Sequence, residues 1–362
     1  MTGPTLGPAG LEALIAAAAA VGLPKLGIVR VDHVGFEASR AAFDRFLARG
    51  FDGEMDFMRT GADTRKHPEW MLEGARSIVV AAAPYRGDDN AVARYAQSRD
   101  YHTEVHERLE HVELTLREHA PGSRNLVCVD TRPIFERAAA ALAGLGFIGK
   151  HGCLIVPGLG SWFVLGAVLT TAAWSGPDAV GEAPAALDAA RWQACGACTK
   201  CLDACPTSAF VGPGDLDARR CIAYLTIEHR GAIDDALADG MGDRLVGCDV
   251  CQQVCPYNAA PGREARIPAA AWLPPPPGGV RVADPWRLVD IGNAPYRAWA
   301  RHTAVRRVTR RSMHRNALIA LGNAAGPLTA EQRARVQALA AGTDAPIAAA
   351  ARRVLERRGG VD

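Results

Sequence analysis

The feature that most constrains this chain is a run of four cysteines closed by a proline, Cys195-x2-Cys198-x2-Cys201-x3-Cys205-Pro206. This spacing is typical of thiolates that bind 4Fe–4S clusters, where the fourth cysteine of the run ligates a second cluster. A later run, Cys248-x2-Cys251-x3-Cys255-Pro256, supplies three more cysteines. Cys221 is the remaining cysteine of this region, so we expect it to complete the second set of ligands.

The expected division gives each cluster four thiolates. One cluster takes Cys195, Cys198, Cys201 and Cys255, and the other takes Cys205, Cys221, Cys248 and Cys251. Two alternatives stay open. In the first the cysteines bind zinc, since zinc sites also use C-x2-C pairs, although they seldom show the complete run. In the second Cys221 is a bystander that ligates no cluster. Cys128 and Cys153 lie outside the array, and we expect both to be buried, inert thiols.

Ten cysteines without a secretory signal predict metal or redox chemistry in a reducing cytoplasm rather than disulfides. The apolar stretch Leu11–Val21 is too short to span a bilayer, and we expect the first helix of a soluble domain there, with no membrane partner. The net charge is only +2, so any nucleic-acid surface must be a local one.

Composition divides the chain into three regions, 1–182, 183–262 and 283–362, with a Gly/Pro/Ala-rich link at Ser175–Ala185 and a proline tract at Pro274–Pro277. The first region alternates strand and helix patterns, which predicts an α+β fold of the α/β sandwich type. Its strands are expected at Leu26–Arg30, Ser77–Ala82 and Asn125–Asp130, with a hairpin of Cys153–Val156 and Trp162–Thr171. Its helices are expected at Leu11–Val21, Arg40–Arg49, Asp100–His119 and Pro133–Leu145.

The third region has only helical periodicity. Helices are expected at Ser312–Leu321, Thr329–Ala340 and Pro346–Arg357. The first of them resembles one helix of a HEAT-type repeat, which is a weak signal because such repeats need stacked neighbours.

Asp130 is the candidate acid of the first region. It ends an expected strand and precedes a helix, which is where α/β folds place active-site groups. Partial desolvation by a flat cofactor would raise the pKa of a carboxyl there and let it donate a proton. A helix N-cap explains the same residue equally well. The nearby Gly144-x-Gly146-x-x-Gly149 follows a helix rather than a strand, so we do not take it as a dinucleotide site.

The ordered set of motifs resembles the epoxyqueuosine reductases, cobalamin-dependent enzymes of queuosine synthesis in tRNA. Besides the cysteine runs it includes Arg99–His102, Val129–Pro133, Ala143–Lys150, Cys221–Glu228 and Gly247–Cys251. The resemblance implies a nitroreductase-like cobalamin-binding domain at 1–182, a ferredoxin-like double-cluster domain at 183–262 and a HEAT-like tRNA-binding domain at 283–362.

The resemblance also implies the reaction. Electrons from a donor such as flavodoxin or ferredoxin would pass through both clusters to cobalamin, and the epoxide of epoxyqueuosine in the anticodon loop would be reduced with Asp130 as proton donor. Residues in segments that would line the corrin are Arg59, Tyr101, His102, Asp130, Lys150, His151, Ile222 and Asp249. Arg132 and His151 replace the glycine and asparagine usual in the family, which puts local contacts in doubt.

A basic stretch from Tyr296 to Asn316 holds seven arginines and no acidic residue. Spacing alone indicates a solvated basic face, but with the resemblance we expect a tRNA surface. Its expected residues are His229, Arg230, Arg306, Arg307, Arg310, Arg311 and Arg315. The alternatives are a cobalamin-dependent reductive dehalogenase and a ferredoxin-type electron relay. We expect a monomer.

Overall fold

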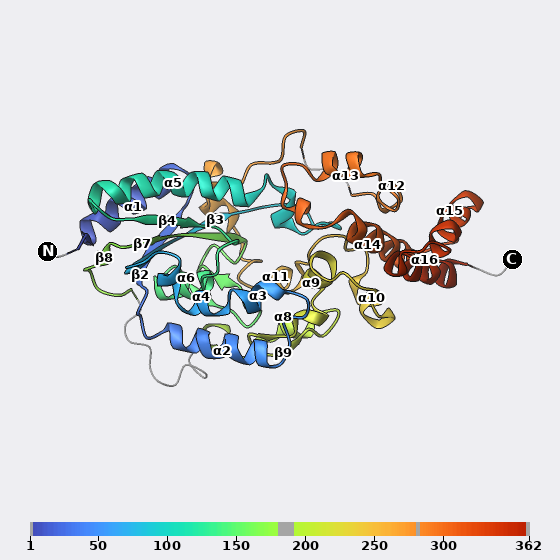
Figure 1. Ribbon diagram of the computed structural model, residues 1–362, viewed down its shortest axis with the longest axis horizontal. Coiled ribbons are helices and arrows are strands. Elements are labelled where there is room, and N and C mark those ends of the chain that lie inside the picture. Colours follow the sequence, from blue (N-terminus) through green and yellow to red (C-terminus); the bar gives the residue numbers. More distant parts are fainter. Residues whose placement is uncertain (1–2, 180–191, 280–282, 360–362) are drawn as a thin grey trace.

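The computed structural model describes residues 3–179, 192–279 and 283–359. Its centre is a four-stranded antiparallel sheet in the order β2-β3-β7-β4 (Figure 1). These strands are β2 (Lys25–Arg30), β3 (Ser77–Pro84), β7 (Phe163–Thr170) and β4 (Asn125–Cys128). Every residue of β3 is buried, because helices cover both faces of the sheet.

Two helical layers enclose this sheet. The helices α1 (Pro8–Ala20) and α5 (Tyr101–His119) cover one face. The opposite face packs against α6 (Glu136–Leu142), which α2 (Phe36–Ala48) covers in turn (Figure 1). Three consecutive buried alanines of α6 let its backbone approach the strands closely. The expected α/β sandwich and its three simple strands are therefore confirmed.

The expected hairpin of Cys153–Val156 and Trp162–Thr171 is wrong. The short strand β6 (Leu154–Ile155) pairs with β5 (Phe147–Ile148), while β7 pairs with β3 and β4. The turn between them closes a single bridge, Val156 to Gly160. Ser161, which follows this turn, is bound to the cysteine-rich segment instead, because its backbone N–H donates to Asn258 Oδ1 at 2.7 Å.

The cysteine-rich segment folds into short elements against the sheet. Two four-residue helices, α8 (Lys200–Asp203) and α11 (Val250–Gln253), contact each other, and each contains one cysteine of the array. Between them lie the pair β9 (Phe210–Gly212) and β10 (Asp215–Leu216) and the helices α9 (Ile222–Ile227) and α10 (Asp235–Met241). The expected boundary at residues 182 and 183 lies outside the described residues.

The C-terminal part is helical, as expected. Its elements are α12 (Pro285–Leu288), α13 (Asn293–Ala300), the 3-10 helix η7 (Ala304–Arg307), α14 (Arg310–Asn323), α15 (Ala330–Ala340) and α16 (Ala345–Arg358). The helix α14 is buried along most of its length between α16 and the α9–α10 segment. One apolar core therefore continues from the sheet through the cysteine-rich segment into these helices.

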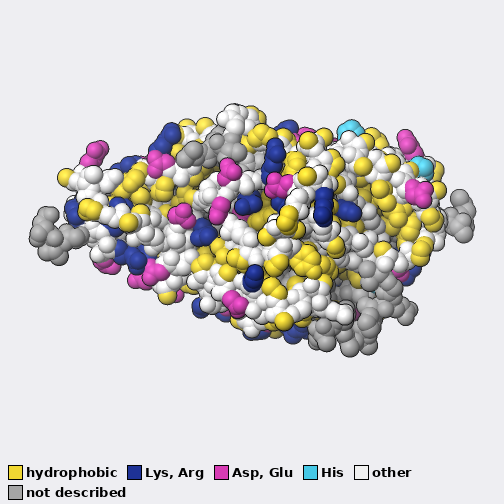
Figure 2. Space-filling model, turned by 180° about the vertical axis from the view of Figure 1, so that it is seen from behind, with side chains coloured by type: hydrophobic (Ala, Val, Ile, Leu, Met, Phe, Trp, Pro, Cys, Tyr) yellow, Lys and Arg dark blue, Asp and Glu magenta, His cyan; other side chains and the backbone are white. Residues whose placement is uncertain are grey.

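Charged side chains are mixed on the surface. The face in Figure 2 shows basic and acidic groups interspersed, in keeping with the small net charge. No helix in the described parts of the chain is long and apolar enough to cross a membrane.

Candidate active site

Asp130 stands two residues beyond the end of β4 in a left-handed backbone conformation, with φ of 54°. Few residues other than glycine adopt this conformation, and aspartate is one of those that tolerate it. The turn directs the carboxylate toward the start of α5 rather than along the sheet. Asp130 does not cap α6, whose N-cap is Phe135, so the alternative of a helix N-cap is wrong.

Three side chains meet one oxygen of this carboxylate. Asp130 Oδ2 accepts a hydrogen bond from the Tyr101 hydroxyl at 2.8 Å and lies 3.1 Å from His102 Nε2. Arg307 Nη1 donates to the same oxygen at 3.0 Å. The other ring nitrogen of His102, Nδ1, lies 2.6 Å from Asp100 Oδ1.

These contacts set the protonation of the site. Burial raises the pKa of Asp130, but hydrogen bonds from His102 and Tyr101 and the charge of Arg307 outweigh it and bring the pKa to about 2. Burial lowers the pKa of His102, and its bonds to Asp100 and Asp130 reverse this and raise it to about 9. The expected rise in the pKa of Asp130 requires desolvation by a bound flat cofactor, and it stays a prediction. At neutral pH the proton is on His102.

Asp130 lies at a cavity of about 340 Å³. Aromatic rings of Tyr85, Tyr95, Tyr101 and Phe163 line it, together with polar groups of Ser161 and Gln252. Gln252 follows Cys251 in α11, and its Nε2 donates to the Tyr85 hydroxyl at 3.3 Å. The cavity is thus lined both by Asp130 and by a residue of the cysteine-bearing helix α11, and its aromatic walls suit a flat cofactor.

The array thiols have two sets of neighbours. Burial raises the pKa of Cys255, and negative charge at Cys195 and Cys198 raises it further. Burial brings the pKa of Cys221 to about 11, with Cys248 and Cys205 contributing in the same direction. These neighbours are the ones the expected division requires, and the division stays a prediction. Among the described residues, no three His, Cys, Asp or Glu side chains gather closely enough to hold a single metal ion.

The structure brings only part of the expected corrin set to the cavity. Tyr101 and Asp130 line it, and His102 touches Asp130. Arg59 instead pairs with Asp52 at 2.6 Å, and Lys150 Nζ donates to the carbonyls of Gly196 and Cys198 at 2.7 and 3.0 Å. None of the other expected residues lines this cavity in the described structure: His151, Ile222 and Asp249 are buried beside it.

His151 and the two outlying cysteines have distinct surroundings. Burial and the charge of Arg137 lower the pKa of His151 to about 4, so the ring is neutral, and its Nε2 has no hydrogen-bond partner among the described residues. Cys128 is fully buried, as expected. Cys153 is half-buried and lines the cavity, and burial raises the pKa of its thiol to about 11, so that it stays largely protonated at neutral pH; that it is inert stays a prediction.

Arg315 does not belong to the expected tRNA surface. It is 1% exposed, and its guanidinium donates to the carbonyls of His229, Gly231 and Leu225 at 2.8, 2.8 and 2.6 Å. Burial lowers its pKa to about 10. The residue therefore clamps α14 onto the segment that follows Cys221, and its assignment to RNA contact is corrected here.

The other basic residues divide by what they touch. Arg307 bridges Asp130 and Glu228, so it belongs to the active site as much as to a surface. His229 pairs with Glu54 at 2.9 Å, and Arg311 pairs with Asp344 at 2.5 Å. Side chains of Arg230 and Arg306 are exposed, and that of Arg310 is half-buried.

Sequence reasoning missed Glu136 as a site residue. Its carboxyl lines the cavity with Arg137, and burial raises its pKa to about 7, despite opposing charges of Arg65 and Arg137. A signal existed in the sequence, because Glu136 lies six residues after Asp130 in the same short polar segment. Its neighbour Arg137 donates to the Gly152 carbonyl and so ties α6 to the Lys150–Gly152 turn.

Comparison with known proteins is consistent with this geometry. Residues 194–258 match the model of a "4Fe-4S double cluster binding domain", a range that contains all eight array cysteines. Residues 65–131 match "Epoxyqueuosine reductase QueG, DUF1730", a range that ends just after Asp130. The chain is 36% identical to the epoxyqueuosine reductase of Gloeobacter violaceus over 84% of its own length and 93% of that protein. The chain belongs to the epoxyqueuosine reductase family.

Solved structures of the family share the whole fold. One, an epoxyqueuosine reductase with a tRNA-Tyr epoxyqueuosine-modified stem loop, is 28% identical with a TM-score of 0.78 and covers 97% of this chain and 90% of that one. Another, from Bacillus subtilis with its aspartate catalytic loop swung out of the active site, is 26% identical with a TM-score of 0.76, at the same coverage. The mixed α/β fold, double-cluster segment and C-terminal helices of this chain are therefore those of the family.

Proposed function

We propose that this chain reduces epoxyqueuosine to queuosine in the anticodon loop of tRNA. Membership in the family supports the activity, which makes the chain an oxidoreductase rather than an electron relay or a dehalogenase. The reaction consumes two electrons and two protons and releases the epoxide oxygen as water. The observation that carries the proposal is the cavity that lies between Asp130 and the cluster-binding helix α11.

Electrons would enter through a cluster held by Cys195, Cys198, Cys201 and Cys255. Gly196 and Ala197, which lie between two of these cysteines in sequence, are exposed, so a donor such as flavodoxin or ferredoxin would approach there. Cys205, Cys221, Cys248 and Cys251 would hold the second cluster, and Cys251 directly precedes Gln252, one of the cavity's lining residues.

Cobalamin fits the chemistry of the cavity walls. Tyr85, Tyr95, Tyr101 and Phe163 offer ring faces and edges to a flat macrocycle. Ser161 and Gln252 offer a hydroxyl and an amide to its amide-bearing rim. When bound there, cobalamin would supply a strongly reducing cobalt centre that opens the epoxide ring.

The protein itself contributes a proton, which is held on His102 Nε2. Opening an epoxide leaves an alkoxide, which needs an acid within hydrogen-bond reach. Asp130 is ionised, so the proton comes from His102 Nε2, which lies 3.1 Å from Asp130 Oδ2. His102 would pass this proton to Asp130, and Asp130 would pass the same proton on to the alkoxide, so that His102 ends neutral and Asp130 ionised, while Asp100 keeps the ring of His102 in place.

Exposed or half-buried basic residues of the C-terminal helices and of the segment after α9 would hold the tRNA. The candidates are Arg230, Arg306, Arg310 and Arg311, with His229 at their edge. This assigns residues 1–182 to a nitroreductase-like cobalamin domain, 183–262 to the ferredoxin-like domain and 283–362 to a HEAT-like tRNA-binding domain. We propose that a monomer carries all three.

Anaerobic reconstitution tests this proposal. Incubation with cobalamin should give corrin absorption, and an anticodon stem-loop bearing epoxyqueuosine should be converted to the queuosine form. Asp130→Asn should keep both the corrin and the cluster bands but lose at least about 100-fold in rate, the usual range for general acids. Asp32→Asn, at a largely exposed carboxylate, is the matched control. Corrin binding without conversion by the unaltered chain would refute the proposal.

A further inference from the structure

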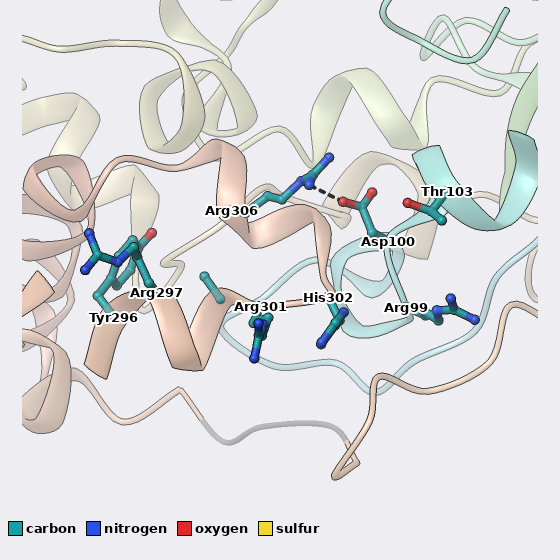
Figure 3. Close-up of a pocket in the computed structure, with 9 residues that line it drawn as sticks. Arg99, Asp100, Thr103, Tyr296, Arg297, Arg301, His302 and Arg306 are labelled. Atoms are coloured by element: carbon teal, nitrogen blue, oxygen red, sulfur yellow. Dashed lines mark ion pairs between the residues drawn. The ribbon is translucent and has the colours of Figure 1, made fainter. Parts of the chain in front are cut away.

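A second cavity, of about 400 Å³, lies where α13 and η7 meet the start of α5 (Figure 3). We call it the arginine pocket, since four of its lining residues are Arg99, Arg297, Arg301 and Arg306. A left-handed turn at His302, with φ of 63°, brings the two parts together. The His302 carbonyl accepts a hydrogen bond from the Asp100 backbone N–H at 2.8 Å.

The charges of the arginine pocket are only partly compensated. Arg306 pairs with Asp100 at 2.8 Å, and Arg99 pairs with Glu104 at 2.6 Å. Arg297 and Arg301 are exposed and form no ion pair with any described residue. In Figure 3 Arg301 and His302 project to the same side of the chain, away from the Arg306–Asp100 pair. The pocket therefore keeps free guanidinium groups for an anion.

A chain of short contacts joins this pocket to the active site. Asp100 Oδ2 binds Arg306 at 2.8 Å, while its Oδ1 lies 2.6 Å from His102 Nδ1. His102 Nε2 in turn lies 3.1 Å from Asp130 Oδ2. Three side chains, those of Arg306, Asp100 and His102, thus connect an anion in the arginine pocket to Asp130.

We propose that the arginine pocket binds a backbone phosphate of the tRNA next to the modified nucleotide. This inference rests on the proposed function and adds a site for its substrate. Guanidinium groups match the geometry of phosphate oxygens, and a phosphodiester needs an open site because its chain must continue on both sides. A single-stranded loop bound here has its next nucleotides beside Asp130, so the phosphate fixes the register of the loop while the cavity receives the base.

Binding measurements with Arg297→Gln plus Arg301→Gln test the proposal. The fully reconstituted protein is titrated with an anticodon stem-loop at several salt concentrations. Losing the contacts to this one phosphate should weaken binding on the order of tenfold and make the salt dependence shallower by about 0.7, the contribution of one neutralised phosphate in a single strand. The effect on turnover should lie mainly in KM, and cluster absorption should be unchanged.

A matched control removes the same charge elsewhere. Arg45→Gln plus Arg117→Gln alters two exposed arginines, one on α2 and the other about 25 Å along α5 from Asp100 at 1.5 Å per residue. If both double variants weaken stem-loop binding equally, the proposal is overturned, because the pocket would then act only as part of the general positive charge of the surface. Unchanged affinity and salt dependence of Arg297→Gln plus Arg301→Gln would overturn it as well.

Neutral methylphosphonates placed singly in the loop separate RNA from a free anion. One position should weaken binding to the unaltered protein and have no further effect on the Arg297→Gln plus Arg301→Gln variant. Inorganic phosphate that binds the unaltered protein but does not compete with the stem-loop would overturn the proposal in favour of a free-anion site. These titrations need no turnover, so failure of the protein to reduce epoxyqueuosine would refute the proposed function without deciding on the pocket.

Discussion

Replacing His102 by glutamine is expected to remove a pH-dependent part of the stability and of the reaction rate. The imidazole is mostly buried and lies between two carboxylates, 2.6 Å from Asp100 Oδ1 and 3.1 Å from Asp130 Oδ2. Glutamine retains a side chain of similar reach but has no proton that titrates. Asp100 keeps its pair with Arg306, and Asp130 keeps Tyr101 and Arg307, so neither carboxylate is stranded.

The magnitude follows from the raised pKa of His102, about 9 against an ordinary 6.5. A shift of this size corresponds to roughly 3 kcal/mol at about 1.4 kcal/mol per pH unit. Because the folded pKa lies above the unfolded one, this stability is complete below pH 6.5 and is lost as the pH rises through about 9. At roughly 2 °C per kcal/mol, the apparent melting temperature should fall by about 6 °C across that window.

Anaerobic thermal melts at a fixed scan rate, taken across that window, measure the effect. The unaltered protein should show the decline, and His102→Gln should show much less of it. His106→Gln is the matched control, since His106 lies about one turn further along α5 and its side chain is 47% exposed. Single-turnover rates should follow the same pattern: the unaltered protein loses activity above about pH 9, and His102→Gln lacks that limb.

Two results would refute this reasoning. A rate for the unaltered protein that stays level beyond pH 9 would mean that His102 does not supply the proton. A decline in melting temperature that persists unchanged in His102→Gln, yet disappears in another variant, would place the titrating group elsewhere.

Two further predictions concern buried charge. Arg315→Met should destabilise the fold by about 3 kcal/mol, because three backbone carbonyls lose a buried charged donor, whereas Arg311→Met, at an exposed arginine, should cost under about 1 kcal/mol in the same anaerobic melts. Stability equal to the unaltered protein with weakened RNA binding would restore Arg315 to the tRNA surface. In the unaltered protein the free energy of unfolding should fall by up to about 3 kcal/mol as the pH rises from 4.5 through about 7, because the folded pKa of Glu136 is raised. Glu136→Gln should abolish this fall. Melts at both ends of that range should differ less in Glu136→Gln, and an unchanged difference would contradict the assignment.

The parts of the fold that were predictable are those with local causes. Strands such as Ser77–Ala82 are continuous apolar runs, and the helix from Asp100 begins at a side chain that caps its own backbone. The hairpin prediction failed because a glycine-rich turn was taken to fix strand pairing. Leu154–Ile155 pairs with Phe147–Ile148 instead, and Ser161, just after the turn, is hydrogen-bonded to Asn258, 97 residues away, a contact that no local pattern contains.

The candidate site shows the same limit. The position of Asp130 after a strand was enough to select it, but its ionisation depends on hydrogen bonds from His102 and Tyr101 and then on the charge of Arg307, all distant in sequence. Arg315 has the three- and four-residue spacing of the exposed arginines, and only its three carbonyl partners reveal that it is structural. Glu136 was overlooked because burial beside a cavity, rather than a motif, raises its pKa.

Arg306 and Arg307 show why the C-terminal helices belong to the active site. A 3-10 helix turns about 120° per residue, so consecutive side chains in η7 point in different directions. Arg306 reaches Asp100 and lines the arginine pocket, whereas Arg307 reaches Asp130 and Glu228. One peptide bond therefore joins a residue of the proposed phosphate site to a residue that sets the charge of the reacting carboxylate. The two arginines of this single turn thus hold Asp100 and Asp130, the two carboxylates between which His102 lies.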